Sequence, residues 1–201
     1  MRAVHIIRCA GQIRQRCEGV TAVEFALVAP IFLMMLLGTF DFGHAVYSRA
    51  ILQGAVQNAG RDSGLESGAG SLGDIDALVL RQVQHVVPKG AILTSRRNYQ
   101  NFDDVGKPED FIDANGNGQY DADECFTDIN DNDQWDADRG VAGLGGADDV
   151  VLYTATLSYN RITPLWNMLG GSDKATISAS TTLRNQPFGD QALREETQIC
   201  P

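Results

Sequence analysis

The stretch that decides the fold is GVTAVEFALVAPIFLMMLLGTFDFGHAVYSRAILQGAVQNA, residues 19–59. Its first part, Val20–Phe40, contains 21 residues and one charged side chain, Glu24. As a helix rising ~1.5 Å per residue, this part measures roughly 31 Å, close to the ~30 Å hydrocarbon core of a bilayer. The sequence therefore predicts a transmembrane helix at residues 20–40.

The helical pattern continues beyond this apolar part. Apolar or small residues recur at nearly helical spacing at Phe42, Ala45, Val46, Ala50, Leu52, Ala55, Val56 and Ala59. This predicts one continuous rod that ends at about Gly60. Glycines 38, 43 and 54 permit close approach of neighbouring helices. The apolar stripe can pack on the protein's own core, on the rods of neighbouring subunits, or on both with different faces.

The preceding residues 1–19 are basic, with four arginines and one acid. Positive charge on this flank places the N-terminus in the cytoplasm and the rest of the chain outside. A secretory signal fits poorly, because the apolar run exceeds the usual roughly 7–15 residues and no A-x-A-like site follows promptly. Two interpretations remain: an uncleaved anchor, or a chain cleaved after Gly19. In the second, the new α-amino group would pair with Glu24 of a neighbouring subunit, whose charge is costly at this position without a partner.

The residues around this point resemble those of a known family. Gly19-Val-Thr-Ala-Val-Glu24-Phe25 resembles a type IV prepilin peptidase site, with cleavage between Gly19 and Val20. Residues 19–59 resemble the TadE-like pseudopilins of the tight-adherence (Tad/Flp) pilus machinery, through AVEFALVAP, the aliphatic run and Asp41-Phe42-Gly43. LRNQPF, residues 183–188, is similar to the Arg-Asn-x-Pro-Phe ending common in that family.

This resemblance implies a single-span protein of the bacterial inner membrane, with its C-terminal domain in the periplasm. It also implies three partners or surroundings: the inner membrane, prepilin peptidase, and other pilins or pseudopilins that contact the N-terminal helix. Whether the protein enters the fibre is left open.

The remaining chain reads as a smaller mixed domain. A Gly/Ser-rich linker is predicted at residues 61–73 and a helix at 72–87. Period-two alternation and β-forming residues predict strands at 91–102, 149–161 and 174–184. Strands that follow a long helix predict an α+β, type IV pilin-like fold, in which the long N-terminal helix packs on a small antiparallel sheet.

The chain's acidity belongs to one segment. The protein has 201 residues, 16 Lys and Arg, 26 Asp and Glu and a net charge of −10, of which residues 103–149 contribute −13 through 15 acids and two bases. Within this segment, residues 113–124 match the EF-hand loop formula D-x-[DN]-x-[DN]-G-x₅-E. The predicted Ca²⁺ ligands are oxygens of Asp113, Asn115, Asn117, Gln119 (its carbonyl), Asp121 and Glu124.

A second, imperfect copy follows fifteen residues later. Its predicted ligands are Asp128, Asn130, Asn132, Gln134, Asp136 and Asp138. Asp133 replaces the turn glycine and Arg139 the closing glutamate, so a second ion requires Asp138, Asp133 or a residue outside the loop. No room is left for flanking helices, so residues 107–139 resemble the helix-less tandem calcium loops of dockerins or thrombospondin type 3 repeats, which implies structural calcium. The alternative is a solvated, disordered acidic loop.

The cysteines and the absence of catalytic motifs complete the prediction. Cys9 and Cys17 lie in the leader, whereas Cys125 and Cys200 can form a disulfide in an oxidising periplasm; the alternative is two free thiols. The acidic balance disfavours nucleic acid as a partner. The three histidines are scattered, and neither an enzyme nor a small-molecule substrate is indicated.

The sequence thus predicts a basic leader (1–19), a transmembrane and amphipathic helix (20–60) and a periplasmic domain (61–201) with tandem calcium loops. The expected function is that of a minor pseudopilin in the assembly of a tight-adherence pilus, processed by prepilin peptidase and stabilised by calcium. The alternative is a membrane-anchored calcium-binding surface or adhesion module, neither cleaved nor part of a pilus. A pseudopilin of a general secretion system is a third interpretation.

Overall fold

The computed structural model describes residues 18–63, 72–186 and 189–201. Most of the predicted leader (residues 1–17) lies outside the described residues, as do residues 187–188 of the second motif. The chain divides into two compact units: Met1–Ala45 with Arg161–Asp173, and Val46–Asn160 with Lys174–Pro201. We call these the first and second unit.

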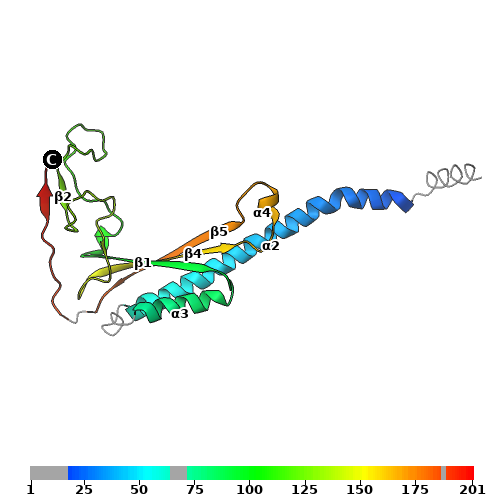
Figure 1. Ribbon diagram of the computed structural model, residues 1–201, viewed down its shortest axis with the longest axis horizontal. Coiled ribbons are helices and arrows are strands. Elements are labelled where there is room, and N and C mark those ends of the chain that lie inside the picture. Colours follow the sequence, from blue (N-terminus) through cyan, green and yellow to red (C-terminus); the bar gives the residue numbers. More distant parts are fainter. Residues whose placement is uncertain (1–17, 64–71, 187–188) are drawn as a thin grey trace, which may run out of the picture. The chain divides into compact units, whose positions relative to one another are not determined.

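The long helix predicted from residues 19–59 is confirmed. Helix α2 runs without interruption through Glu18–Ser63, with Pro30 inside it (Figure 1). The side chains of its N-terminal half are almost all exposed, whereas Leu52, Ala55 and Val56 in its C-terminal half are no more than 2% exposed. The two halves of one helix therefore meet different surroundings.

The second unit contains a four-stranded antiparallel sheet. Its strands are β1 (Ala91–Tyr99), β3 (Val141–Ala142), β4 (Val150–Asn160) and β5 (Lys174–Arg184), in the order β3-β1-β4-β5. Every residue of β4 pairs with one of β5, from Val150 opposite Arg184 to Asn160 opposite Lys174. Alternate residues of β4 are buried, as its period-two pattern predicts.

The core lies between this sheet and two helices. Helix α3 (Leu72–Gln84) turns Ile75, Val79 and Val83 inward. The C-terminal half of α2 joins these residues, and the sheet contributes Tyr153, Ala155, Leu157, Tyr159, Ala175 and Ala179. The prediction of a helix packed on a small antiparallel sheet is confirmed, and the fold is α+β. The second unit begins at Val46 rather than at residue 61, because the last turns of α2 form part of its core.

Gly60 shows how closely this helix approaches the sheet. A Cβ atom at Gly60 would lie 2.6 Å from Cγ2 of Thr181 on β5, closer than real carbon atoms come. A larger residue would push α2 away from the sheet, so only glycine fits the observed packing at this position.

Two predicted boundaries differ from the structure, and a short strand was not predicted. The helix predicted to reach residue 87 ends at Gln84, because the N–H groups of Val86 and Val87 both donate to the carbonyl of Val83 and close a turn. The strand predicted to reach residue 102 ends at Tyr99, and a short 3₁₀ turn, η2 (Phe102–Asp104), follows. Strand β3 escaped prediction because two residues carry no periodicity.

Asp76 of α3 joins this helix to the sheet. Its carboxylate accepts hydrogen bonds from Arg96 (2.6 and 3.1 Å), Thr94 (3.0 Å) and the Tyr153 hydroxyl (2.8 Å). Burial raises the pKa of Asp76, but the hydrogen bonds from Arg96, Tyr153 and Thr94 outweigh it, so that the pKa is lowered. The same surroundings raise the pKa of Tyr153, first through burial and then through its bond to Asp76.

We expect Asp76→Asn to reduce the free energy of unfolding by about 2–3 kcal/mol at neutral pH, since it weakens hydrogen bonds to a partly buried charge. A lowered folded pKa stabilises the protein above the unfolded value of about 3.9, and this stabilisation is lost as pH falls through the folded pKa. The gap between wild type and variant should therefore close in acid. Urea titrations at several pH values measure it, with Asp74→Asn, an exposed residue of the same helix, as the control.

Candidate metal centre and membrane helix

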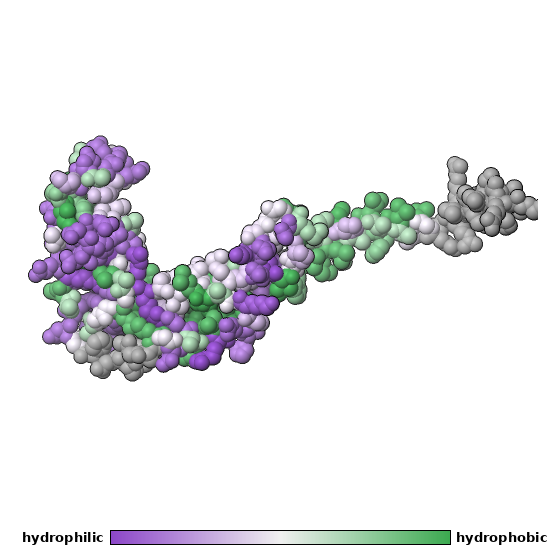
Figure 2. Space-filling view, in the orientation of Figure 1, coloured by the Kyte–Doolittle hydropathy of each residue, from purple (hydrophilic) through white to green (hydrophobic). Residues whose placement is uncertain are grey.

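The N-terminal half of α2 has an apolar surface. Helix residues Gly19–Asp62 are long and apolar enough to cross a membrane by length and composition; the most apolar window has a mean hydropathy of 2.3 and no buried residue. Figure 2 shows this apolar surface along the helix. The predicted processing residues Gly19, Val20 and Glu24 lie in its first turns and are exposed.

Just beyond the apolar part of α2, Asp41 is bound by the segment Arg161–Asp173, which belongs to the same unit. Asp41 is only 3% exposed, and its Oδ2 accepts hydrogen bonds from Arg161 Nη1 (2.7 Å) and Trp166 Nε1 (3.0 Å). The Arg161 guanidinium lies 4.9 Å from the centre of the Trp166 ring. The Asp-Phe-Gly step of the sequence thus supplies the carboxylate of a buried ion pair.

The first acidic loop (residues 113–124, loop one) is wrapped around its leading carboxylate. Asp113 accepts backbone N–H bonds from Gly116 (2.7 Å), Asn117 (3.2 Å) and Gly118 (2.8 Å). The second (residues 128–139, loop two) does the same, since Asp128 accepts from Asp131 (2.7 Å) and Asp133 (2.8 Å). The fifteen-residue repeat of the sequence is therefore a structural repeat.

The missing glycine of loop two does not change its backbone. Gly116 and Gly118 of loop one have φ values of 75°, and their counterparts Asp131 and Asp133 have φ values of 61° and 59°. A left-handed conformation is strained for a residue with a Cβ atom, although Asp tolerates it better than most. Loop two therefore adopts the geometry of loop one at some cost in backbone strain.

Asparagine amides converge on one carboxylate in each loop. The Nδ2 atoms of Asn115 and Asn117 donate to Asp121 Oδ2 at 2.7 and 2.8 Å in loop one. The Nδ2 atoms of Asn130 and Asn132 donate to Asp136 Oδ2 at 2.6 Å each in loop two. The backbone N–H groups of Gln119 and Gln134 donate to the preceding asparagine Oδ1 atoms. The predicted ligands at these positions are thus brought together.

The residue that closes loop two comes from outside it. In loop one, Glu124 accepts backbone N–H bonds from Ala114 (2.8 Å) and Asp121 (3.1 Å). In loop two, the equivalent N–H groups, of Ile129 (2.9 Å) and Asp136 (3.0 Å), donate to Glu109.

Glu109 stands fifteen residues before Glu124, at the same position of the repeat. Each repeat therefore lends its leading glutamate to the loop of the other. The sequence predicts that Asp138, Asp133 or a residue outside loop two closes it, and the repeat, in which Glu109 aligns with Glu124, carries the signal for Glu109.

Asp138 and Arg139 have other partners. Asp138, a predicted ligand of loop two, accepts a hydrogen bond from the Tyr99 hydroxyl (2.9 Å) and lies 3.1 Å from Arg97. Burial, together with the Asp138 carboxylate, raises the pKa of Tyr99 to about 12, which keeps this phenol protonated as a donor. Arg139 binds the Pro108 carbonyl. Asp138 is therefore bound by two residues of strand β1, and Glu109 stands at the closing position of loop two.

Four aromatic rings hold the two loops together. Tyr120 and Trp135, at equivalent positions of the repeat, are stacked with ring centres 4.7 Å apart and 14° between the planes. Phe111 and Phe126, also equivalent, meet this pair edge-on at 5.7–6.2 Å. Trp135 Nε1 donates to the carbonyl of Glu109 at 3.0 Å. Tyr120 of loop one and Trp135 of loop two therefore pack one repeat against the other.

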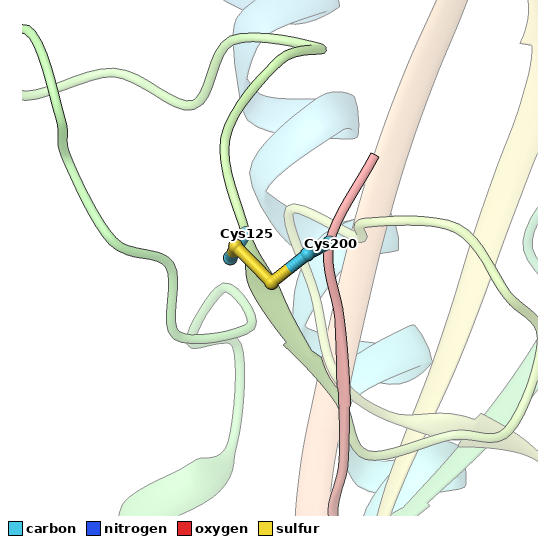
Figure 3. Close-up of a disulfide and its surroundings, with 2 residues drawn as sticks. All are labelled: Cys125 and Cys200. Atoms are coloured by element: carbon cyan, nitrogen blue, oxygen red, sulfur yellow. A yellow bond between two sulfur atoms is a disulfide. The ribbon is translucent and has the colours of Figure 1, made fainter.

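The C-terminal tail is attached to the same region. Strand β6 (Thr197–Ile199) pairs with β2 (Phe126–Asp128) in an antiparallel two-stranded sheet. Next to these strands, the Sγ atoms of Cys125 and Cys200 are joined at 2.09 Å, as Figure 3 shows. Because Cys125 stands between the loops, the disulfide ties the end of the chain to both.

Three carboxylates of the repeat are buried, whereas Asp113 is exposed. Glu109 is 0%, Asp128 2% and Glu124 3% exposed. Within residues 18–63, 72–186 and 189–201, no group of three or more His, Cys, Asp or Glu side chains stands in a geometry that could hold a metal ion. The side chains that converge in the loops include asparagine amides, which are not among these four residue types.

The apolar helix is the part of the chain that is similar to known proteins. Residues 19–61 match the model of a family described as TadE-like protein. No curated protein matches the chain, and no solved structure matches it. The matched residues coincide with α2, so the acidic loops and the sheet fall outside the similarity.

Proposed function

We propose that this protein is a TadE-like minor pseudopilin that acts in the assembly of a tight-adherence pilus. The observation that carries the proposal is the TadE-like match over residues 19–61, on a helix whose first turns hold Gly19 and Glu24. The exposed apolar surface of the N-terminal half of that helix suits a bilayer, and later the helices of neighbouring subunits. Gly43 and Gly54, which have open space at their Cβ positions, suit close helix contacts.

The proposal includes cleavage by prepilin peptidase between Gly19 and Val20. Cleavage removes four arginines and one glutamate, so that the mature chain carries a net charge of −13. The new α-amino group can then form an ion pair with the Glu24 carboxylate of a neighbouring subunit. An acid at the end of a membrane span is costly without such a partner.

Calcium at the two acidic loops is the second component of the proposal. Oxygens of Asp113, Asn115, Asn117, Gln119, Asp121 and Glu124 would hold one ion, and those of Asp128, Asn130, Asn132, Gln134, Asp136 and Glu109 the other. An asparagine amide that turns half-way around its last bond presents oxygen in place of nitrogen, which suits these donors to a hard cation. Buried carboxylates are costly without a compensating positive charge, which two divalent ions supply.

The role we propose for this calcium is structural. No helix lies between residues 105 and 164, so binding has no pair of helices to open, as it has in calcium sensors. Extracytoplasmic calcium at millimolar levels is enough for modules with Kd of ~10⁻⁴–10⁻³ M. The ions would hold the aromatic and disulfide-linked region in one conformation.

Processing is the direct test of the pseudopilin assignment. In cells with active prepilin peptidase, intact-mass measurement should find a chain that begins at Val20, and in cells with an inactive peptidase one that begins at Met1. Gly19→Leu should block cleavage, because it places a bulky side chain at the bond between residues 19 and 20 that is proposed to be cut. Gly11→Leu, within the leader, should still be cleaved.

Complementation then tests the pilus itself. A strain that lacks the gene should lose surface pili and recover them with the wild-type chain but not with Gly19→Leu. A chain that keeps Met1 beside an active peptidase, in a strain with normal pili, would overturn the proposal in favour of an uncleaved calcium-binding surface module.

A further inference from the structure

The segment between β4 and β5 is an uncharged, apolar projection of the first unit. Eleven residues, 162–172, carry no charged side chain. Four of their large apolar residues are exposed: Ile162 (56%), Trp166 (43%), Met168 (77%) and Leu169 (65%). Trp166 and Met168 belong to the short helix α4 (Leu165–Met168), which lies within this segment. Four exposed apolar side chains on so short a loop form a cluster of the kind that marks a contact site.

This segment is fixed beside the end of the apolar part of α2. Arg161 and Trp166 both bind Asp41, and Leu165, which is 7% exposed, lies 3.5 Å from the position a Cβ would take at Gly38. Gly38 and Asp41 are one turn of helix apart. Helix α4 of this segment therefore lies beside α2 at the end of its apolar part (Figure 1).

The chemistry of the contact suits the interface of a bilayer. Asp41, the first charge after the apolar run, is neutralised by Arg161, so the pair adds no net charge at that level. The indole N–H of Trp166 is satisfied by Asp41 while its ring remains partly exposed. Tryptophan prefers the headgroup region for its amphipathic ring, and Met and Leu favour the acyl chains below.

We propose that residues 162–169 insert into the outer interfacial layer of the membrane that α2 spans, so that the protein has two membrane contacts. The inference rests on the proposed membrane insertion of α2 and adds a second site of lipid contact. The occupant is lipid because Leu165 beside Gly38 and Arg161 on Asp41 hold the segment against the last turn of the apolar helix. The Asp41–Arg161 pair sets the depth of the segment, since it fixes the segment to one turn of α2.

The two tryptophans of the chain, Trp135 and Trp166, make this testable by fluorescence. The full-length chain is reconstituted into vesicles whose lipids carry bromine in the upper acyl chain. With Trp135→Phe, emission from Trp166 should fall about twofold relative to vesicles without bromine, as for a ring at the headgroup level. With Trp166→Phe, emission from Trp135 should not change. Flotation of the vesicles shows separately whether the chain is anchored.

A charge placed on the segment gives a second readout. In the Trp135→Phe background, Met168→Asp with Leu169→Asp should abolish the quenching, whereas Leu193→Asp, at a residue 83% exposed elsewhere, should leave it unchanged. A chain that floats but shows no quenching of Trp166 overturns the inference and leaves the anchor intact; it would point to a protein partner for this segment. A chain that does not float overturns the membrane anchor and this inference together.

Discussion

Chelation of calcium should lower the unfolding temperature of the full-length protein in detergent by roughly 10–20 °C. For sites with Kd of ~10⁻⁴ M, calcium at about 10 mM is a hundredfold excess, so that two sites contribute about 5 kcal/mol by mass action, and a domain of this size shifts by roughly 2–4 °C per kcal/mol. The physical reason is the burial of Glu109, Glu124 and Asp128, whose charges lose their compensating cation when calcium is removed. Melting curves with millimolar calcium and with chelator provide the measurement.

The reciprocal arrangement of the glutamates sharpens this prediction. Glu124→Gln should remove the ion of loop one and Glu109→Gln that of loop two, so that isothermal titration finds one ion per chain instead of two in either variant. Asp123→Asn, a change at an exposed residue beside Glu124, should retain both. Unfolding temperatures that are identical with and without chelator would rule out calcium. Two ions in Glu109→Gln would show that loop two is closed by another acid.

Loss of the disulfide is expected to have the next largest effect. Cys125 and Cys200 are 75 residues apart, and a loop of that length corresponds to about 4 kcal/mol of lost chain entropy in the unfolded state. Cys125→Ser with Cys200→Ser should therefore lower the unfolding temperature by roughly 10–15 °C. Strand β6 pairs over only three residues, so it should detach from β2 in this variant and leave the tail open to proteolysis.

The leader cysteines provide the matched control for this variant. Cys9→Ser with Cys17→Ser should leave both the unfolding temperature and the protease resistance of the tail unchanged. Wild-type protein treated with reductant should behave as the Cys125/Cys200 variant does. If both thiols of the mature, unreduced protein react with an alkylating agent after denaturation, the bond does not form and the predicted loss disappears with it.

Much of this fold could be predicted because its signals are local. A stretch of 21 residues with a single charge specifies a helix of membrane length, and the alternation of β4 and β5 specifies strands with one buried face. The fifteen-residue repeat predicted two loops of one geometry, which the structure contains. Elements that escaped prediction, such as β3 and β6, are too short to carry a period.

The candidate site was less predictable where its partners are distant in the chain. With Arg139 at the closing position, the sequence leaves Asp138, Asp133 or a residue outside the loop to close loop two. In the folded protein, the stacking of Tyr120 on Trp135 places the two repeats face to face, which brings Glu109 to loop two across 20 residues of chain. The sequence motif describes a single loop, so it cannot show that each repeat supplies the closing glutamate of the other.

The sequence by itself determined the apolar helix, the α+β class and the donor atoms of the loops, because each follows from neighbouring side chains through helical or strand periodicity and fixed motif spacing. Only the tertiary structure decided which acid closes loop two and what Asp41 binds. Arg161 and Trp166 reach Asp41 over separations of 120 and 125 residues. Such contacts depend on the packing of whole elements, since a buried carboxylate takes whichever donors the fold delivers to it.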